Sequence, residues 1–421
     1  MALPSLPRLP GLPTSPTAGT GLSYHDLQSK YNDFAFPKAI IQLNKKKIAA
    51  ATGTHVVVND IRVELTSGFE ASMASFKLYN VYDTKMGKFR YDDVKSQVFL
   101  GAPVAILMGY MEAMEVVFMG FVAGVAFGFS SDDLPYIEVT AMDIKGMMMG
   151  GTYSYQLTSK TYGEAVAEIF RRSGYEKLKT MGGISGLQID DTPDKKPTVP
   201  GMPAPAASAG AETIELVAES DYDFVVKAAK KFNFEFFVEK GMVRFRRAKS
   251  NTATLAALGP GSGVENFRVE YSLTGLVDRV EARSMDVGKG KIVTARSTLD
   301  NTLSVSDKAA GLVGKTAKVF IDPTITTQAQ ADARVASLLE TMSYRLGSME
   351  ADCVGIPELL PGHFITLSSL GAPADNQFYL TSVVHEFLPE GGYRTKLIGC
   401  TDRVLPGGLS ATHSVPGVPG I

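Results

Sequence analysis

The chain has 421 residues, of which 45% are apolar, so it is long enough for two or three domains with buried cores. It carries 42 basic and 44 acidic side chains, a formal net charge of -2. Proteins that hold nucleic acid through its phosphates are usually clearly basic, so this balance argues against tight nucleic-acid binding. The first residues lack a positive segment followed by an apolar run, so we expect no secretory signal peptide and assembly in the bacterial cytoplasm.

The first 20 residues follow a three-residue repeat. Prolines stand at positions 4, 7, 10, 13 and 16, and the leucines with the same period are Leu3, Leu6, Leu9 and Leu12. A polyproline II helix has three residues per turn, so these leucines would share one edge. Two interpretations of residues 1–37 stay open: a disordered proline-rich tail, or an extended arm whose leucine edge docks in a groove of a partner subunit.

Residues 38–150 predict β-structure, because short alternating segments are separated by glycine and aspartate turns. Asn59-Asp60 has the composition of a two-residue hairpin turn between two such segments. We therefore expect a first small antiparallel β-barrel in this region.

The uncharged run from Val116 to Phe129 carries Gly120, Gly124 and Gly128 at four-residue steps. In a membrane helix this spacing would form a packing face of small residues. A membrane span needs about 20 residues, however, and glycine within a strand often marks a bend or bulge. We expect a curved, buried strand and no membrane span.

Residues 151–263 predict an α+β insert. Thr161 and Glu164 form a capping box at the start of a helix, and Gly174 is placed to end it. A proline-rich stretch at 190–211 predicts a stiff, exposed linker. Ser220 then begins a second helix, which a strand pair follows.

Residues 264–403 predict a second β-barrel, interrupted by a helix over 327–344. Thr327 and Gln330 form a capping-box pair at the start of this helix. Residues 404–421 predict a flexible tail.

The most informative segment runs from Gly347 to Cys400. It contains short alternating strands, each bounded by proline or glycine, and Pro361-Gly362 suits a tight turn. The residues that define the pattern are Gly355, Pro361, Gly362, Tyr379, His385, Gly392, Tyr393 and Thr395. This order of strands and turns resembles the closing barrel of the phage late control D family, which comprises baseplate hubs of contractile phage tails and the hub half of type VI secretion VgrG spike proteins.

The resemblance covers roughly residues 38–403 and includes the acidic-aromatic phrase from Glu219 to Phe224. It implies two similar small barrels per chain and a homotrimer whose six barrels form a pseudo-sixfold ring. Such a virion structural protein would join a threefold spike to a sixfold inner tube. The implied partners are a spike protein, an inner-tube or tube-initiator protein and baseplate wedge proteins. Little chain follows Cys400, so we expect the spike to be a separate chain.

Neither the motifs nor the resemblance predicts an enzyme or a cofactor. The five histidines show no metal-binding spacing, and no phosphate-binding glycine loop occurs. His385 is expected to be a structural residue that hydrogen-bonds a neighbouring loop. The carboxylate pairs Asp132-Asp133 and Asp190-Asp191 are expected to lie in solvated turns. Cys353 and Cys400 fall on strands of one barrel, and free thiols or a disulfide both stay open. The alternative functions are a secreted β-rich hydrolase and a glycan- or receptor-binding tail protein.

Overall fold

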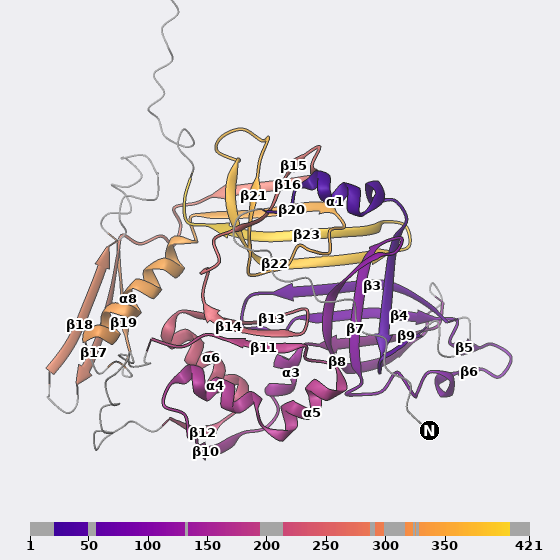
Figure 1. Ribbon diagram of the computed structural model, residues 1–421, viewed down its shortest axis with the longest axis horizontal. Coiled ribbons are helices and arrows are strands. Elements are labelled where there is room, and N and C mark those ends of the chain that lie inside the picture. Colours follow the sequence, from indigo (N-terminus) through magenta and orange to yellow (C-terminus); the bar gives the residue numbers. More distant parts are fainter. Residues whose placement is uncertain are drawn as a thin grey trace, which may run out of the picture.

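The computed structural model describes residues 21–48, 56–130, 134–193, 214–286, 291–298, 316–322, 325 and 328–404. Several predictions lie outside these residues: the leucines of the arm, Asp132-Asp133, Thr327, most of the linker and the tail from residue 405. The protein is mainly β, with 49% strand and 19% helix (Figure 1). None of the described helices is both long and apolar enough to cross a membrane.

An antiparallel sheet occupies the N-terminal region, drawn in purple in Figure 1. Its strands pair in the order β2-β1-β7-β8-β9-β4-β3. Alternate side chains of these strands point into the core, as in β4, where Ala74, Phe76 and Leu78 are buried. The strands are β1 (Pro37–Leu43), β2 (Lys46–Lys47), β3 (Val57–Thr66), β4 (Met73–Tyr79), β7 (Pro103–Tyr110), β8 (Ala113–Gly128) and β9 (Tyr136–Met142). The small hairpin β5 (Tyr82–Asp83) and β6 (Lys88–Phe89) extends from one end.

The predicted curved strand is confirmed as β8. Its ladders with β7 and β9 each contain a register shift, and the shift against β9 lies between Val122 and Gly124. Such bulges bend a strand and increase its twist. The burial prediction holds for the first part only, because Phe127 at the far end is 49% exposed.

The predicted hairpin turn at Asn59-Asp60 is wrong, because β3 continues through both residues. Asp60 takes a left-handed φ of 52°, and the ladder with β4 resumes at Arg62 after a register shift. A β-bulge therefore replaces the turn: aspartate tolerates left-handed backbone, and the apolar side chains on both sides stay on the core face.

A closed, mixed barrel of six strands forms the C-terminal unit, which we call the ring. Its strands follow the order β22-β21-β15-β16-β20-β23, and β23 pairs back onto β22. The ring includes β15, which lies before residue 264, the predicted start of this barrel. Its strands are β15 (Thr254–Pro260), β16 (Gly263–Tyr271), β20 (Gly347–Val354), β21 (Phe364–Leu367), β22 (Asn376–Leu388) and β23 (Gly392–Thr401).

The strand β22 joins the two units. Along one edge, residues 376–379 pair with β21 of the ring, and residues 382–387 pair with β3 of the N-terminal sheet. The described strands do not close a second barrel, since the outer edge of β3 pairs with β22 and not with β1. One continuous apolar core nevertheless spans both units, with Phe76 and Phe378 fully buried in it.

The insert packs its helices around its own core, to which Phe121 of β8 contributes. Thr161 caps α4 as predicted, accepting a hydrogen bond from the Glu164 N–H at 3.2 Å. The Gly174 prediction is wrong: α4 ends at Phe170, and Gly174 lies within the next helix. The elements are α3 (Ile144–Met148), β10 (Tyr153–Gln156), α4 (Tyr162–Phe170), α5 (Ser173–Met181), β11 (Gly186–Ile189), β12 (Glu215–Glu219), α6 (Asp221–Phe232), β13 (Phe234–Glu239) and β14 (Met242–Arg247).

A separate three-stranded sheet carries the predicted helix near residues 327–344. The helix is α8 (Gln328–Ser343), and Val335 and Met342 pack it against Val280 and Ala282 of the sheet. The opposite face of the sheet bears the exposed side chain of Met285. The strands are β17 (Arg279–Asp286), β18 (Lys291–Thr298) and β19 (Ala317–Ile321).

Candidate functional site

The residues of the C-terminal pattern come together where the segment 355–363 crosses β22 and β23. The backbone N–H of Gly355 donates to the Tyr393 carbonyl at 3.0 Å, and the Tyr110 hydroxyl donates to the Gly355 carbonyl at 2.9 Å. A Cβ at position 355 would lie 2.2 Å from the Tyr393 ring, so this contact requires glycine. The pattern therefore ties the segment to both the ring and β7 of the N-terminal sheet.

His385 is fully buried at the centre of this junction. Its Nε2 lies 3.1 Å from the Leu359 carbonyl oxygen, which only accepts, so Nε2 carries the proton. Its Nδ1 then accepts from the Tyr393 hydroxyl at 3.0 Å, and the Thr395 hydroxyl lies 3.2 Å away. This is the contact with a neighbouring loop that the sequence suggested.

Burial lowers the pKa of His385 to about 3, so the imidazole is neutral at physiological pH. Thr395 completes the arrangement by accepting a hydrogen bond from the Ile356 N–H at 3.1 Å. Both nitrogens of the neutral imidazole are engaged by protein groups, so the hydrogen bonds of His385 fix the loop against β23.

Pro361 and Gly362 form the predicted turn, with Gly362 at a φ of 85°. The Gly362 N–H donates to the Leu380 carbonyl at 2.9 Å, which fastens the turn to β22. The Gly362 carbonyl accepts a hydrogen bond from Arg246 of the insert. Gly392 begins β23 at the opposite end of the pattern, in the hairpin that follows β22.

A buried ion pair links this turn to the insert. Arg246 Nε lies 2.6 Å from Glu235 Oε1, and the side chains are only 9% and 7% exposed. The Tyr379 hydroxyl donates to the other oxygen of Glu235. Burial, followed by the Glu235 charge, raises the pKa of Tyr379 well above its usual value, so the phenol keeps its proton. Tyr379 belongs to the C-terminal sequence pattern, whereas Glu235 and Arg246 lie on insert strands and have no local sequence signal.

Two further ion clusters flank the segment. Glu239 lies 3.2 Å from His363 Nε2 and 2.8 Å from Arg244 Nη2. Burial alone would raise the pKa of Glu239, but the contacts with His363 and Arg244 lower it to about 2.

In the second cluster, Lys30 of α1 (Tyr24–Lys30) bridges Glu115 at 2.8 Å and Glu358 at 2.7 Å. The Tyr31 hydroxyl donates to Glu358 as well, at 2.7 Å. These residues lie far apart in the sequence, and no local motif predicts their contact. The two clusters hold α1, β8 and the insert hairpin against the ring.

The cysteines do not pair. Cys353 lies opposite Thr395, and Cys400 lies opposite Ser348, five residues further along β20. Five residues of strand span about 17 Å, beyond the reach of a disulfide. Burial raises the pKa of Cys353 to about 12 and of Cys400 to about 11, so both thiols are protonated and unreactive.

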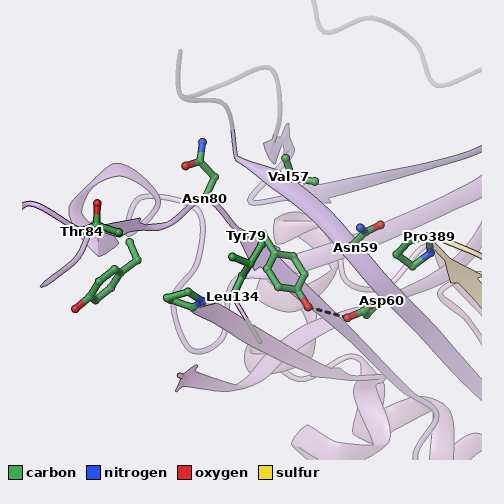
Figure 2. A pocket seen from close by; sticks show the side chains of 10 residues that line it. Val57, Asn59, Asp60, Tyr79, Asn80, Thr84, Leu134 and Pro389 are labelled. Carbon is green, nitrogen blue, oxygen red and sulfur yellow. Dashed lines mark hydrogen bonds between the residues drawn. The ribbon is translucent and has the colours of Figure 1, made fainter. Parts of the chain in front are cut away.

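A surface hollow of about 540 Å³ opens at the end of β3 and β4 (Figure 2). The Tyr79 hydroxyl donates to Asp60 across its floor at 2.9 Å. The described residues contain no group of three or more His, Cys, Asp or Glu side chains suited to a metal ion. The lining residues are Val57, Asn59, Asp60, Tyr79, Asn80, Tyr82, Thr84, Leu134, Pro135 and Pro389.

Comparison with known proteins gives a similarity of fold. The family model of the Alg8 N-terminal domain matches residues 206–388, less than half of the chain. No curated protein sequence matches.

Solved structures, in contrast, match most of the chain. The 43 kDa tail protein of prophage MuSo2 from Shewanella oneidensis is 12% identical, with a TM-score of 0.60, over 86% of this chain and 98% of that one. The tail protein from Neisseria meningitidis MC58 is 11% identical, with a TM-score of 0.61, over 87% and 97%. Prophage tail protein gp18 from Listeria monocytogenes EGD-e is 10% identical, with a TM-score of 0.51, over 86% and 94%. The chain therefore has a fold found in phage tail proteins.

Proposed function

We propose that the protein is a structural baseplate hub of a contractile injection machine, such as a phage tail, a tailocin or an injection particle. In this role three copies form a ring that joins a threefold spike to a sixfold inner tube. The observation that carries the proposal is the likeness of fold to two phage tail proteins over nearly their whole length. The order of the C-terminal pattern from Gly355 to Thr395 adds support from the sequence.

Sixfold contacts from three chains require two similar units in each chain. We assign these units to residues 38–150 and 264–403, with the α+β insert at 151–263 between them. In support, the N-terminal sheet has six strands in ladder order from β1 to β3, and the ring also has six. In the assembly the N-terminal sheet would serve as the second barrel.

The partners under this proposal are further copies of the chain, a spike protein, an inner-tube or tube-initiator protein and baseplate wedge proteins. The hub would assemble in the bacterial cytoplasm and become part of the particle baseplate. The pattern residues Gly355, Pro361, Gly362, Tyr379, His385, Gly392, Tyr393 and Thr395 would act as internal braces. Their buried, hydrogen-bonded state supports a structural role rather than a catalytic one.

Co-expression with a spike protein, followed by light scattering, tests the proposal. The expected mass of the hub component is three times the 45.1 kDa of the chain. Electron micrographs of the same complex should show a ring with three or six lobes. A chain that stays monomeric with its spike partner, or a complex with unrelated symmetry, would contradict the proposal.

A further inference from the structure

We propose that the hollow at the end of β3 and β4 receives the N-terminal arm, residues 1–20, of a neighbouring copy of this chain. The inference rests on the proposed assembly of several copies. It assigns to the arm an acceptor surface that is defined by described residues (Figure 2).

The wall of the hollow has the chemistry of a proline-rich docking groove. Tyr79, Tyr82 and Pro135 supply flat apolar surfaces, and the amide of Asn59 can hydrogen-bond to a peptide backbone. Grooves lined by aromatic residues bind polyproline II segments because such segments are already extended and lose little entropy on docking. A volume of about 540 Å³ falls within the usual range of ligand sites.

The apolar surface continues beyond the hollow. Leu134 at its rim is 69% exposed, and Phe129 nearby is 72% exposed. Phe129 stacks on Tyr82 with ring centroids 6.3 Å apart, so the exposed aromatic patch and the hollow are contiguous. Exposed apolar patches of this kind mark interaction sites, since leaving them in water costs free energy.

The arm has matching chemistry. On a three-residue period its leucines form one edge, its prolines a second, and the third edge carries Ala2, Ser5, Arg8, Gly11, Thr14, Thr17 and Thr20. An arm with one apolar edge and one small, polar edge suits a one-sided groove. Arg8, the one charged side chain in residues 1–20, would join Asp60, the one charged residue that lines the hollow, which already lies 3.4 Å from Lys77 Nζ.

The described part of the chain begins against the ring, and the proposed assembly sets which hollow the arm enters. Leu22 is bonded to the ring, its N–H donating to the Leu255 carbonyl of β15 at 2.6 Å. The hollow lies on the N-terminal sheet, because Asp60 of β3, Tyr79 of β4 and Tyr82 of β5 line it. In a circular assembly in which the two units of successive copies alternate, the C-terminal barrel of one copy adjoins the N-terminal sheet of the next copy. Twenty residues of polyproline II span about 60 Å, enough to cross that boundary.

Cysteine cross-linking in the full-length chain tests this placement. Leu6→Cys combined with Leu134→Cys should give covalent oligomers on denaturing gels after mild oxidation. The unreactive native thiols keep the background low, and the wild-type chain measures it. The matched control combines Leu6→Cys with Val217→Cys, because Val217 is similarly exposed, at 64%, but lies on β12 of the insert. No oligomers are expected from the control.

Three results would overturn the proposal. One is the absence of cross-linking between Leu6→Cys and Leu134→Cys. Another is a cross-link within a single chain, which mass spectrometry of the digest would reveal. The third is equally efficient cross-linking of Leu134→Cys to Val415→Cys, because the C-terminal segment would then occupy the hollow.

A peptide of residues 1–20, labelled with a fluorophore and titrated into the full-length protein, tests the chemistry separately from assembly. Leu6→Ala with Leu9→Ala in the peptide should weaken binding at least tenfold, whereas Ser5→Ala with Thr14→Ala should change it less than twofold. Equal effects would overturn the proposal. Light scattering on the same protein shows whether copies associate, so a failure of the hub assembly is distinguishable from a failure of the arm to bind.

Discussion

The ring has six strands and the N-terminal sheet has seven, and the two units differ at their edges. In the ring every strand has a β neighbour on both sides, because β23 returns to β22. In the N-terminal sheet the outermost strand is the two-residue β2, which pairs only with Gln42 and Leu43 of β1. The rest of the outer edge of β1 has no strand partner among the described strands. The difference arises because one edge of β22 is shared between two partners. Its first residues pair with β21 and help to close the ring, whereas residues 382–387 pair with β3, so β3 does not pair with β1 to close a second barrel.

The largest expected effect comes from the core that the two units share. Phe378→Ala in the ring and Phe76→Ala in the N-terminal sheet each remove a fully buried aromatic ring from one cluster. Each should lower the free energy of unfolding by about 3–5 kcal/mol. Urea unfolding, followed by fluorescence and circular dichroism, should show one transition that moves in both variants. A second transition in Phe76→Ala alone would show that the two units unfold independently.

The next effect concerns the buried ion pair of the insert, which contacts the ring side through Gly362 and Tyr379. Arg246→Met leaves Glu235 buried without its cation and should cost about 3–5 kcal/mol. Adding Glu235→Leu should recover part of that loss, because no buried charge then remains. A double-mutant cycle by urea unfolding measures the coupling. Additive losses would show that Arg246 and Glu235 do not stabilise each other across the insert hairpin.

His385 gives a smaller, pH-dependent effect. Its pKa is lowered to about 3 in the folded protein, against about 6.5 in an unfolded chain, so the unfolded state binds the extra proton between these values. Stability should therefore fall as the pH drops through this window, by at most about 1.4 kcal/mol per unit.

His385→Gln removes this proton site. It should lose about 1–3 kcal/mol at pH 7 and show a weaker loss than the wild type between pH 7 and pH 5. The control is His25→Gln on the exposed side of α1, which should change neither quantity. Parallel pH profiles for His385→Gln and the wild type would contradict the buried, neutral imidazole.

The smallest effect lies where the two units meet. The Ser382 hydroxyl of β22 donates to the Leu65 carbonyl of β3 at 3.1 Å. Ser382→Ala should cost about 0.5–1.5 kcal/mol. Hydrogen exchange should speed up mainly in residues 61–66, with the β22–β23 ladder unchanged. Uniform acceleration in both ladders would mean that the two halves of β22 are not distinct.

Local patterns in the sequence predicted much of the fold. The caps at Thr161 and Ser220, the Pro361-Gly362 turn and the alternating strands all depend on neighbouring residues, so they could be read directly. Gly174 does not end α4, because a glycine can also lie in a new helix that begins after a short break. The missing closure of a second barrel depends on pairing between β3 and β22, more than 300 residues apart, which no local pattern encodes.

The candidate site was predictable only where its residues lie close together in the sequence. The residues around His385 follow one another closely in the sequence, so their grouping could be expected. Their partners Tyr110, Glu235 and Arg246 come from other parts of the chain and are ordinary strand residues when read alone. The hollow, likewise, combines residues from the ends of several strands.

The continuity of β22 has a mechanical consequence. Its backbone runs without interruption from the closed ring into the ladder with the N-terminal sheet. A pulling force applied to either unit along this strand is carried by covalent bonds, while the flanking hydrogen bonds share it in shear instead of opening one at a time. Tension along β22 therefore passes from one unit to the other through a single continuous strand.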